Sequence, residues 1–123
     1  MVIDTGIFIE HLRSKNKKTT KLYLLPESIP LFISSVALYE LYIGATTKEK
    51  ENDILILTKD LIVLHFTDTV AIRSAQLYHQ LKQNNNMIEF RDIFIAATCL
   101  VNELPLLTLN IKHFERINGL EVI

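Results

Sequence analysis

The chain has few of the residues that mark secreted, membrane-bound or repetitive proteins. Its single cysteine, Cys99, excludes an internal disulfide and is typical of a reducing compartment, so we expect a cytoplasmic protein. No apolar run approaches the roughly 20 residues of a membrane-spanning helix, and we expect no membrane partner. The opening run Met1–Ile3 is short and is interrupted by Asp4 and then Glu10, so it does not match a secretory signal.

Length and composition predict one globular domain over residues 1–123. Hydrophobic residues make up 49% of the chain and charged residues 22%, which is an ordinary balance. A chain of this size can bury about two thirds of its unfolded surface in a single core. The sequence has no internal repeat, linker or low-complexity tract. Cys99 lies in the apolar run AATCLV, and we expect it to pack in the core.

The charge pattern permits nucleic-acid binding without requiring it. The formal net charge is −1, from 13 basic and 14 acidic residues. Five of the bases fall within nine residues: Arg13, Lys15, Lys17, Lys18 and Lys21. Such a run is usually a solvated face, although beside a metal site it would also contact phosphates.

Short apolar segments alternate with helical ones along the chain. The predicted strands are Met1–Asp4, Leu31–Ile33, Leu61–Phe66 and Pro105–Leu109, with Glu121–Ile123 as a candidate fifth. The predicted helices are Thr5–Arg13, Lys17–Leu25, one from Ser34–Ser35 through Ala45, Lys48–Asp60, one after the cap Thr67–Thr69, and Ile93–Val101. This alternation predicts an α/β three-layer sandwich, in which helices flank a parallel sheet of four or five short strands.

Two of the predicted helices differ in their apolar pattern. The helix after Thr69 is expected to be amphipathic, with an apolar face of Ile72, Ala75, Leu77 and Leu81. The helix Ile93–Val101 is apolar throughout, and we expect it to be buried nearly all round.

Three carboxylates lie in otherwise apolar stretches of three different elements. Asp4 lies in MVIDTGIFI, Glu40 in SSVALYELYIGA and Asp92 in FRDIFIAATCLV. Acidic side chains are rarely buried unless they are paired or bind a cation. In parallel sheets ligands bind at the carboxyl ends of the strands, where Asn110 also ends a predicted strand. We therefore expect these four side chains to reach one cleft that binds a metal ion.

Each of these residues also has a purely structural interpretation. Asp4 and Asp92 each precede or open a helix, and aspartate is a preferred N-cap. Glu40 would be satisfied by a hydrogen bond to a buried tyrosine. Asn110 would be an ordinary turn residue.

Four segments together resemble a known family: VIDTGIFIE, ISSVALYELYIGA, FRDIFIAATCL and LLTLNIKHFERINGLEVI. They resemble PIN-domain proteins, specifically the small VapC-type toxins of bacterial toxin–antitoxin pairs, and cover essentially the whole chain. The resemblance implies a ribonuclease dependent on Mg²⁺ or Mn²⁺, with Asp4, Glu40 and Asp92 at the family's acidic positions. The family often has a fourth acid where this chain has Asn110. Because an amide brings no charge, we expect one firmly held metal ion.

The resemblance also implies partners. Similar proteins form homodimers, and their antitoxins insert a segment into the cleft, often bringing an arginine to the acids. Exposed apolar and aromatic side chains are expected to form part of an interface: Tyr23, Leu24, Leu25, Tyr39 and Tyr42.

The chemistry of such a site depends on its donors. Mg²⁺ prefers oxygen ligands and is typically held by one or two carboxylates, water and substrate phosphate. Asp4 and Asp92 are the expected ligands, while Glu40 would bind the ion or accept a proton from the attacking water. In-line attack on RNA would leave a 5′-phosphate and a 3′-hydroxyl. The hydroxyls of Thr5, Ser34 and Thr108 flank the site, where they would orient acids or phosphate, or serve only as caps and strand-end hydrogen bonds.

Three other functions compete with this interpretation. Asp4, Thr5 and Gly6 spell the D-T-G of aspartic proteases, which need a glycine-rich β chain, whereas this sequence has three glycines. A metal-independent nuclease needs paired histidines, and the four histidines lie in different elements with no evident pairing. Only His113 comes near the expected cleft, and we interpret it as a surface residue. A PIN-fold module that binds RNA or protein without activity is the third alternative, and the presence of all three acids argues against it.

Overall fold

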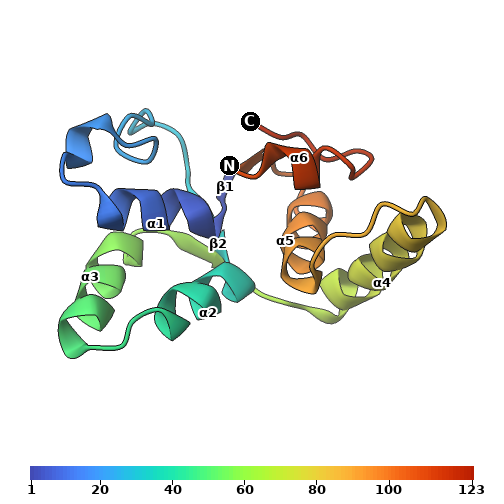
Figure 1. Cartoon of the computed structure of the whole chain (residues 1–123), viewed down its shortest axis with the longest axis horizontal. Coiled ribbons are helices and arrows are strands. Elements are labelled where there is room, and N and C mark those ends of the chain that lie inside the picture. Colours follow the sequence, from blue (N-terminus) through green and yellow to red (C-terminus); the bar gives the residue numbers. More distant parts are fainter.

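A computed structural model describes all of residues 1–123 and has four short parallel strands at its centre (Figure 1). The strands are β1 (Val2–Ile3), β2 (Phe32–Ser34), β3 (Ile62–Leu64) and β4 (Leu106–Leu107), in the order β3-β2-β1-β4. Val2 pairs with both Phe32 and Leu106, so β1 lies inside the sheet. The predicted parallel sheet is confirmed with four strands. The candidate fifth strand is a single bridge between Leu106 and Val122.

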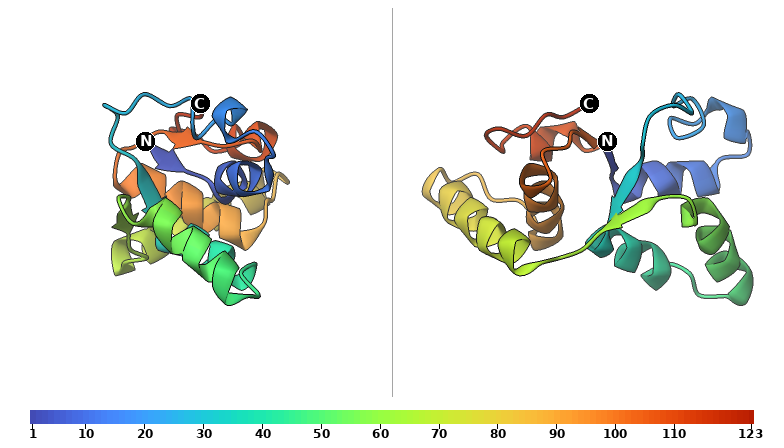
Figure 2. Two further views of the ribbon diagram at one scale, coloured as in Figure 1. Left: turned by 90° about the vertical axis from the view of Figure 1, so that its left-hand side faces the viewer. Right: turned by 180° about the vertical axis from the view of Figure 1, so that it is seen from behind.

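Helices cover both faces of the sheet (Figures 1 and 2). One face carries α1 (Thr5–Arg13), α2 (Ser35–Ile43) and α3 (Lys48–Thr58), and the other carries α4 (Asp68–Gln83) and α5 (Phe90–Val101). The chain steps from β1 to β2 to β3 and then returns past β1 to β4. Right-handed crossovers therefore place the first three helices opposite the next two. The direction reverses between β1 and β4, which is where ligands bind in such sheets.

The core runs through the sheet and both helical layers. Val2, Ile3 and Leu106 are fully buried in the central strands. No residue of α5 after Arg91 is exposed, so the prediction of a buried helix is confirmed. Burial raises the pKa of Cys99 to about 12, and its thiol is a core side chain as predicted.

The helix predicted over Lys17–Leu25 is wrong beyond its first turn. The structure has only a 3₁₀ turn, η1 (Lys17–Thr19), followed by turns without regular structure. The side chains of Asn16 and Thr20 each accept a backbone N–H two or three residues ahead. Such local bonds offer the backbone an alternative to a helix, which explains why this segment does not continue.

Lys17 differs from the solvated basic residues around it. Its ammonium group donates to three carbonyl oxygens at the end of α1, those of His11 (2.6 Å), Leu12 (2.7 Å) and Ser14 (2.9 Å). The carbonyl of His11 also accepts the backbone N–H of Ser14 at 3.4 Å, whereas those of Leu12 and Ser14 lie beyond the last bonds of the helix. A cation there also stabilises the negative end of the helix dipole. Lys17 is therefore a structural cap, which its place in a basic run did not indicate.

The buried face of α4 is rotated from the predicted one. Ile72 is 62% exposed and Ala75 is also exposed, so the prediction is wrong for both. The residues that α4 buries are Val70, Ser74, Leu77 and Leu81. Ser74 can be buried because its hydroxyl donates to the carbonyl of Val70 at 2.8 Å.

The segment after β4 forms a helix that the sequence did not predict, α6 (Ile111–Phe114). Its four residues are too few to show a helical period. Phe114 is nevertheless fully buried and anchors the turn to the core. None of the helices has both the length and the apolar character needed to cross a bilayer.

Candidate active site

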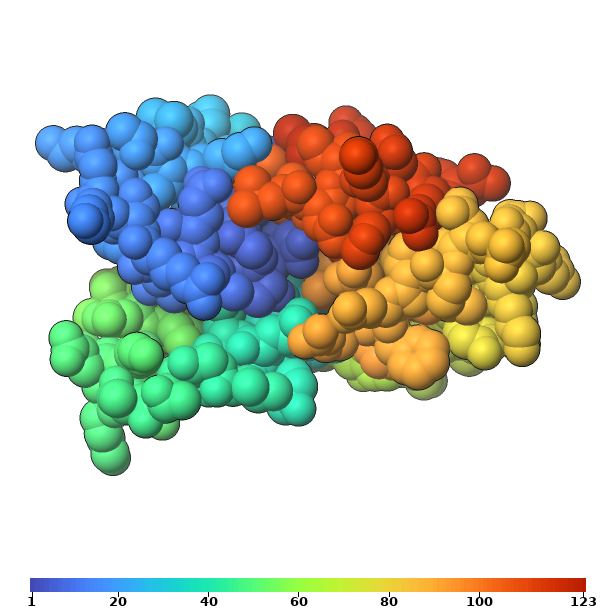
Figure 3. All heavy atoms as spheres, in the orientation of Figure 1, coloured from blue at the N-terminus to red at the C-terminus, as the bar shows by residue number.

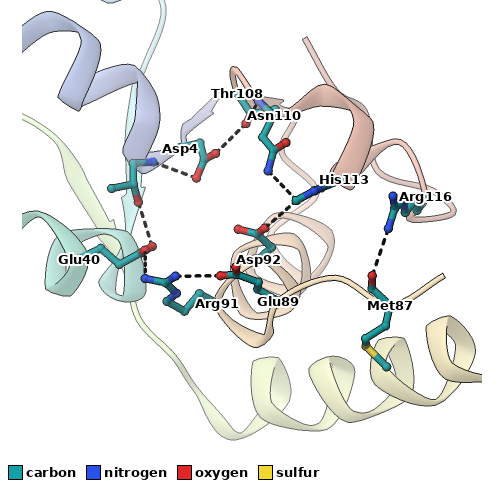
Figure 4. Close-up of polar contacts among 11 residues, drawn as sticks. Asp4, Glu40, Met87, Glu89, Arg91, Asp92, Thr108, Asn110, His113 and Arg116 are labelled. Atoms are coloured by element: carbon teal, nitrogen blue, oxygen red, sulfur yellow. Dashed lines mark hydrogen bonds and ion pairs between the residues drawn. The ribbon is translucent and has the colours of Figure 1, made fainter.

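Asp4 lies at the carboxyl edge of the sheet, between β1 and β4. It directly follows β1 and is buried. Its Oδ1 accepts the backbone N–H of Thr5 at 2.9 Å, and its Oδ2 accepts the hydroxyl of Thr108, just after β4, at 2.6 Å (Figure 4). Asp4 is therefore the N-cap of α1, as the structural interpretation proposed. The cap bond uses Oδ1 of Asp4. The position of Asp4 after β1 also places this carboxyl group near Glu40 and Asp92.

The surroundings of Asp4 are electrostatically unfavourable to its charge. Burial raises the pKa of Asp4, and the bonds from Thr108 and Thr5 act in the opposite direction. The nearby charges of Asp92 and Glu40 raise the pKa of Asp4 further. Asp92 and Glu40 therefore lie close enough to Asp4 for their charges to act on it, as expected if the three carboxylates share a cleft.

Glu40 approaches the same region from the middle of α2. Its Oε1 accepts the hydroxyl of Thr5 at 3.0 Å, and its Oε2 pairs with Nη1 of Arg91 at 3.0 Å. No tyrosine hydroxyl bonds to Glu40, so the structural alternative for this residue is wrong. Thr5 and Arg91 hold the carboxylate beside Asp4 (Figure 4).

Asp92 is the third residue of α5, which begins earlier than predicted, at Phe90. Glu89 is the N-cap of this helix, so the interpretation of Asp92 as a cap is wrong. Oδ2 of Asp92 lies 3.3 Å from Nδ1 of His113. The same ring nitrogen lies 2.6 Å from the amide nitrogen of Asn110. Asn110, His113 and Asp92 therefore form a chain of contacts between α6 and α5.

The three predicted hydroxyls have different positions. Thr5 and Thr108 donate directly to Glu40 and Asp4. Ser34 instead accepts the backbone N–H of Ala37 at 3.0 Å, and its hydroxyl makes no hydrogen bond to the three acids. Ser34 is the N-cap of α2, as its capping interpretation predicted.

Sequence reasoning missed Arg91 and underestimated His113. Arg91 precedes Asp92 and reaches Glu40, which is 51 residues away in the sequence. Its position in FRDIF, a basic residue beside an acid at the start of an apolar helix, was the available signal. The signal for His113 was its spacing of three residues from Asn110.

The oxygen donors at this edge fit a hard divalent cation held partly through water. No three His, Cys, Asp or Glu side chains in the chain lie close enough to hold an ion as direct ligands. Mg²⁺ does not require such a cage, because it usually keeps several waters and takes one or two carboxylates. Asp4 and Asp92 provide two carboxylates whose mutual repulsion a cation would relieve.

A groove of about 320 Å³ begins at Glu40 and extends between α1, α2 and α3. Five of its ten lining residues are hydrophobic. It is lined by Ile9, Leu12, Arg13, Glu40, Leu41, Gly44, Ala45, Lys50, Asp53 and Ile54. The surface view shows the boundary along which the blue segment of α1 meets the teal segment of α2 and the green segment of α3 (Figure 3).

Residues 1–120 match the PIN domain family, and the chain belongs to this family. Within it, the chain is similar to ribonuclease VapC10 of Mycobacterium tuberculosis, with 32% identity over 114 residues covering 93% of this chain and 85% of the relative. Ribonuclease VapC1 of Rickettsia felis is 32% identical over 130 residues, covering 100% of this chain and 94% of the relative. The predicted family is therefore confirmed.

Solved structures show the same fold. The chain is similar to a chain of VapBC2 from Rickettsia felis, crystallised with a promoter DNA fragment, with a TM-score of 0.84 and 27% identity. The likeness covers 99% of this chain and 96% of that chain. VapBC-1 of nontypeable Haemophilus influenzae gives a TM-score of 0.85 at 25% identity, covering 99% and 95%.

Proposed function

We propose that this PIN-domain protein is a metal-dependent endoribonuclease and the toxin of a toxin–antitoxin pair. The observation that carries the proposal is the convergence of Asp4, Glu40 and Asp92, from three separate elements, at the carboxyl edge between β1 and β4. The names of the relatives, which are VapC ribonucleases, support the reaction. The VapBC structures support the toxin role.

The cofactor in this proposal is Mg²⁺ or Mn²⁺, held by Asp4 and Asp92 directly or through water. When bound, such an ion polarises the scissile phosphoryl group and lowers the pKa of a bound water. The structure places no third acid close enough to complete a direct ligand set, and Asn110 adds no charge. One ion per site is therefore the expected stoichiometry.

The protein groups in this proposal act mainly by holding the acids in place. Thr5 and Thr108 fix the carboxylate of Asp4, which leaves it a small range of orientations. Thr5 also fixes Glu40, which we assign as the acceptor of a proton from the attacking water. In-line attack then breaks the bond to the 3′-oxygen, and the products carry a 5′-phosphate and a 3′-hydroxyl.

Two protein partners belong to the same proposal. An antitoxin segment would occupy the half-apolar groove that begins at Glu40, where it would also cover the acids. A second copy of the chain would cover exposed apolar side chains. Of those predicted for an interface, Tyr23, Leu24, Tyr39 and Tyr42 are exposed and Leu25 is half-buried.

Chelation and end-group analysis test the reaction. The purified chain is incubated with end-labelled single-stranded RNA in Mg²⁺ or Mn²⁺, in EDTA, and in EDTA followed by excess Mn²⁺. We expect cleavage with metal, none in EDTA and recovery after Mn²⁺ is added, with 5′-phosphate and 3′-hydroxyl ends. Cleavage that survives EDTA, or ends that carry a 2′,3′-cyclic phosphate, would contradict the proposal. If no RNA is cut with either ion, a binding module without activity becomes the better account.

A further inference from the structure

Arg91 is the one lysine or arginine that forms ion pairs with the acids at the carboxyl edge of the sheet, which we call the acidic edge. Its Nη1 lies 3.0 Å from Oε2 of Glu40, and its Nη2 lies 2.8 Å from Oε2 of Glu89. No other lysine or arginine in the chain pairs with a carboxylate within 4.0 Å. Figure 4 shows its guanidinium group between the two acids, beside Asp92.

The two pairs leave the guanidinium of Arg91 largely exposed. The side chain of Arg91 is 56% exposed and that of Glu89 is 65% exposed, so water screens this pair, whereas the side chain of Glu40 is 16% exposed. Each pair is a single contact to a different carboxylate, instead of the two parallel bonds that make an arginine–carboxylate pair strong. The bond to Glu89 and the charge of Glu40 raise the pKa of Arg91, which therefore remains charged. An anion that accepts two parallel bonds from the guanidinium can therefore replace the carboxylates of Glu40 and Glu89.

The acidic edge needs a cation if RNA is to approach it. Glu40, Glu89 and Asp92 lie around Arg91, and Asp4 lies close to Glu40 and Asp92. The charges of these acids repel the phosphates of an RNA strand. An open hollow of about 470 Å³ lies over the segment 88–91, and Arg91 lines it. A phosphate has room to approach the guanidinium there without displacing a core side chain.

We infer that Arg91 is a phosphate-binding residue, which turns from Glu40 and Glu89 to an RNA phosphate adjacent to the scissile one. The planar fork of a guanidinium matches two phosphate oxygens better than it matches two separate carboxylates. When Arg91 turns away, Glu40 keeps only the hydroxyl of Thr5 as a partner and is free to accept a proton. RNA binding therefore frees Glu40, which is the proposed proton acceptor, from its ion pair with Arg91. This inference rests on the proposed function.

A simpler role for Arg91 is that of a fixed counterion to Glu40. Both roles predict weaker RNA binding when the positive charge is removed, because the edge becomes more acidic. A variant with unchanged net charge separates them. Glu89→Gln combined with Arg91→Gln removes one charge of each sign from neighbouring positions, so it leaves the net charge of this edge as it is.

Fluorescence anisotropy with a labelled single-stranded RNA, in EDTA and over a range of salt, measures binding by the full chain. We expect Arg91→Gln to weaken binding about tenfold at low salt and to reduce the slope of log K against log salt by about 0.7, the value for one phosphate contact. Arg91→Lys should weaken RNA binding less than Arg91→Gln does, because lysine keeps the positive charge but lacks the planar guanidinium that binds two phosphate oxygens. The charge-matched double variant should still bind more weakly than the wild type.

Controls make the outcome decisive. Arg73→Gln removes the same charge from α4, where the guanidinium of Arg73 hydrogen-bonds only to Gln76, and should leave the salt slope unchanged. Thermal unfolding of every variant shows whether the fold is intact. If the double variant binds like the wild type, or if Arg91→Gln keeps the full salt slope, the inference is wrong. The anisotropy assay measures binding without cleavage. A wild type that binds RNA but does not cut it would therefore contradict the proposed function, and the binding data would still decide the role of Arg91.

Discussion

Thr5 donates its hydroxyl to Oε1 of Glu40 across 3.0 Å, which joins the end of β1 to the middle of α2. The backbone N–H of Thr5 donates to Asp4 at the same time. One residue therefore sets the positions of two acids that are far apart in the sequence. The consequence is that a small change at Thr5 should affect the site without affecting the core.

Replacing Thr5 should lower activity more than stability. Thr5→Ala removes the hydroxyl bond to Glu40, and we expect RNA cleavage about tenfold to a hundredfold slower, as for other residues that orient site ligands. Thr5→Ser keeps the hydroxyl and should stay close to the wild type. Initial cleavage rates at saturating RNA test this. Equal rates for the alanine and serine variants would show that the hydroxyl is not needed.

Asp4→Asn should make the metal-free protein more stable at neutral pH. Because the pKa of Asp4 is raised in the folded state, the fold binds its proton more tightly than the unfolded chain does. Stability is therefore lost as the pH rises from the ordinary aspartate pKa through the higher folded one. Asparagine cannot ionise and escapes this loss.

Thermal unfolding in EDTA between pH 4 and pH 7 measures this effect. The melting temperature of Asp4→Asn should exceed that of the wild type at pH 7, and the difference should shrink toward pH 4. Added Mn²⁺ should also shrink it, by stabilising only the wild type. A variant that is less stable at every pH would show that the carboxylate is favourable where it lies.

Lys17 should matter for stability and Lys18 should not. Lys17→Met removes three bonds to the end of α1, and we expect a loss of about 1 kcal/mol in the free energy of unfolding. Lys18→Met is the matched control, because it removes the same charge from a side chain that makes no bond to the end of α1. Urea denaturation distinguishes the two variants. Equal stabilities would mean that the cap contributes nothing.

Asn110→Asp should strengthen metal binding. The substitution adds a carboxylate beside His113, which itself lies 3.3 Å from Asp92. We expect the Kd for Mn²⁺ measured by titration calorimetry to fall, since a further anionic oxygen ligand favours a hard cation. Asn110→Ala should bind Mn²⁺ much as the wild type does. An unchanged Kd in the aspartate variant would place Asn110 outside the metal site.

The parallel sheet and the positions of the acids at its carboxyl edge could be predicted because local patterns determine them. Each strand is short and apolar, each is followed by helical sequence, and the first acid comes directly after the first strand. The rule that parallel strands present ligands at their carboxyl ends then brings Asp4, Glu40 and Asp92 together. Nothing beyond pattern and topology was needed for this step.

The parts of the site that could not be predicted depend on contacts between distant segments. Arg91 pairs with Glu40 only because α5 begins at Phe90 and its first turn faces α2. His113 reaches Asp92 through α6, which is too short to leave a periodic signal. Helix ends and single long-range pairs are set by packing, which a local pattern does not contain.

The central claim is that acids from separate elements form one metal-dependent nuclease site. The most direct test compares single-turnover cleavage of a labelled RNA by the wild type, Asp4→Asn and Asp92→Asn at the same Mn²⁺ concentration. We predict that each variant keeps its cooperative unfolding transition and cuts RNA at least about a hundredfold more slowly than the wild type. Cleavage by either folded variant at the wild-type rate would contradict the claim.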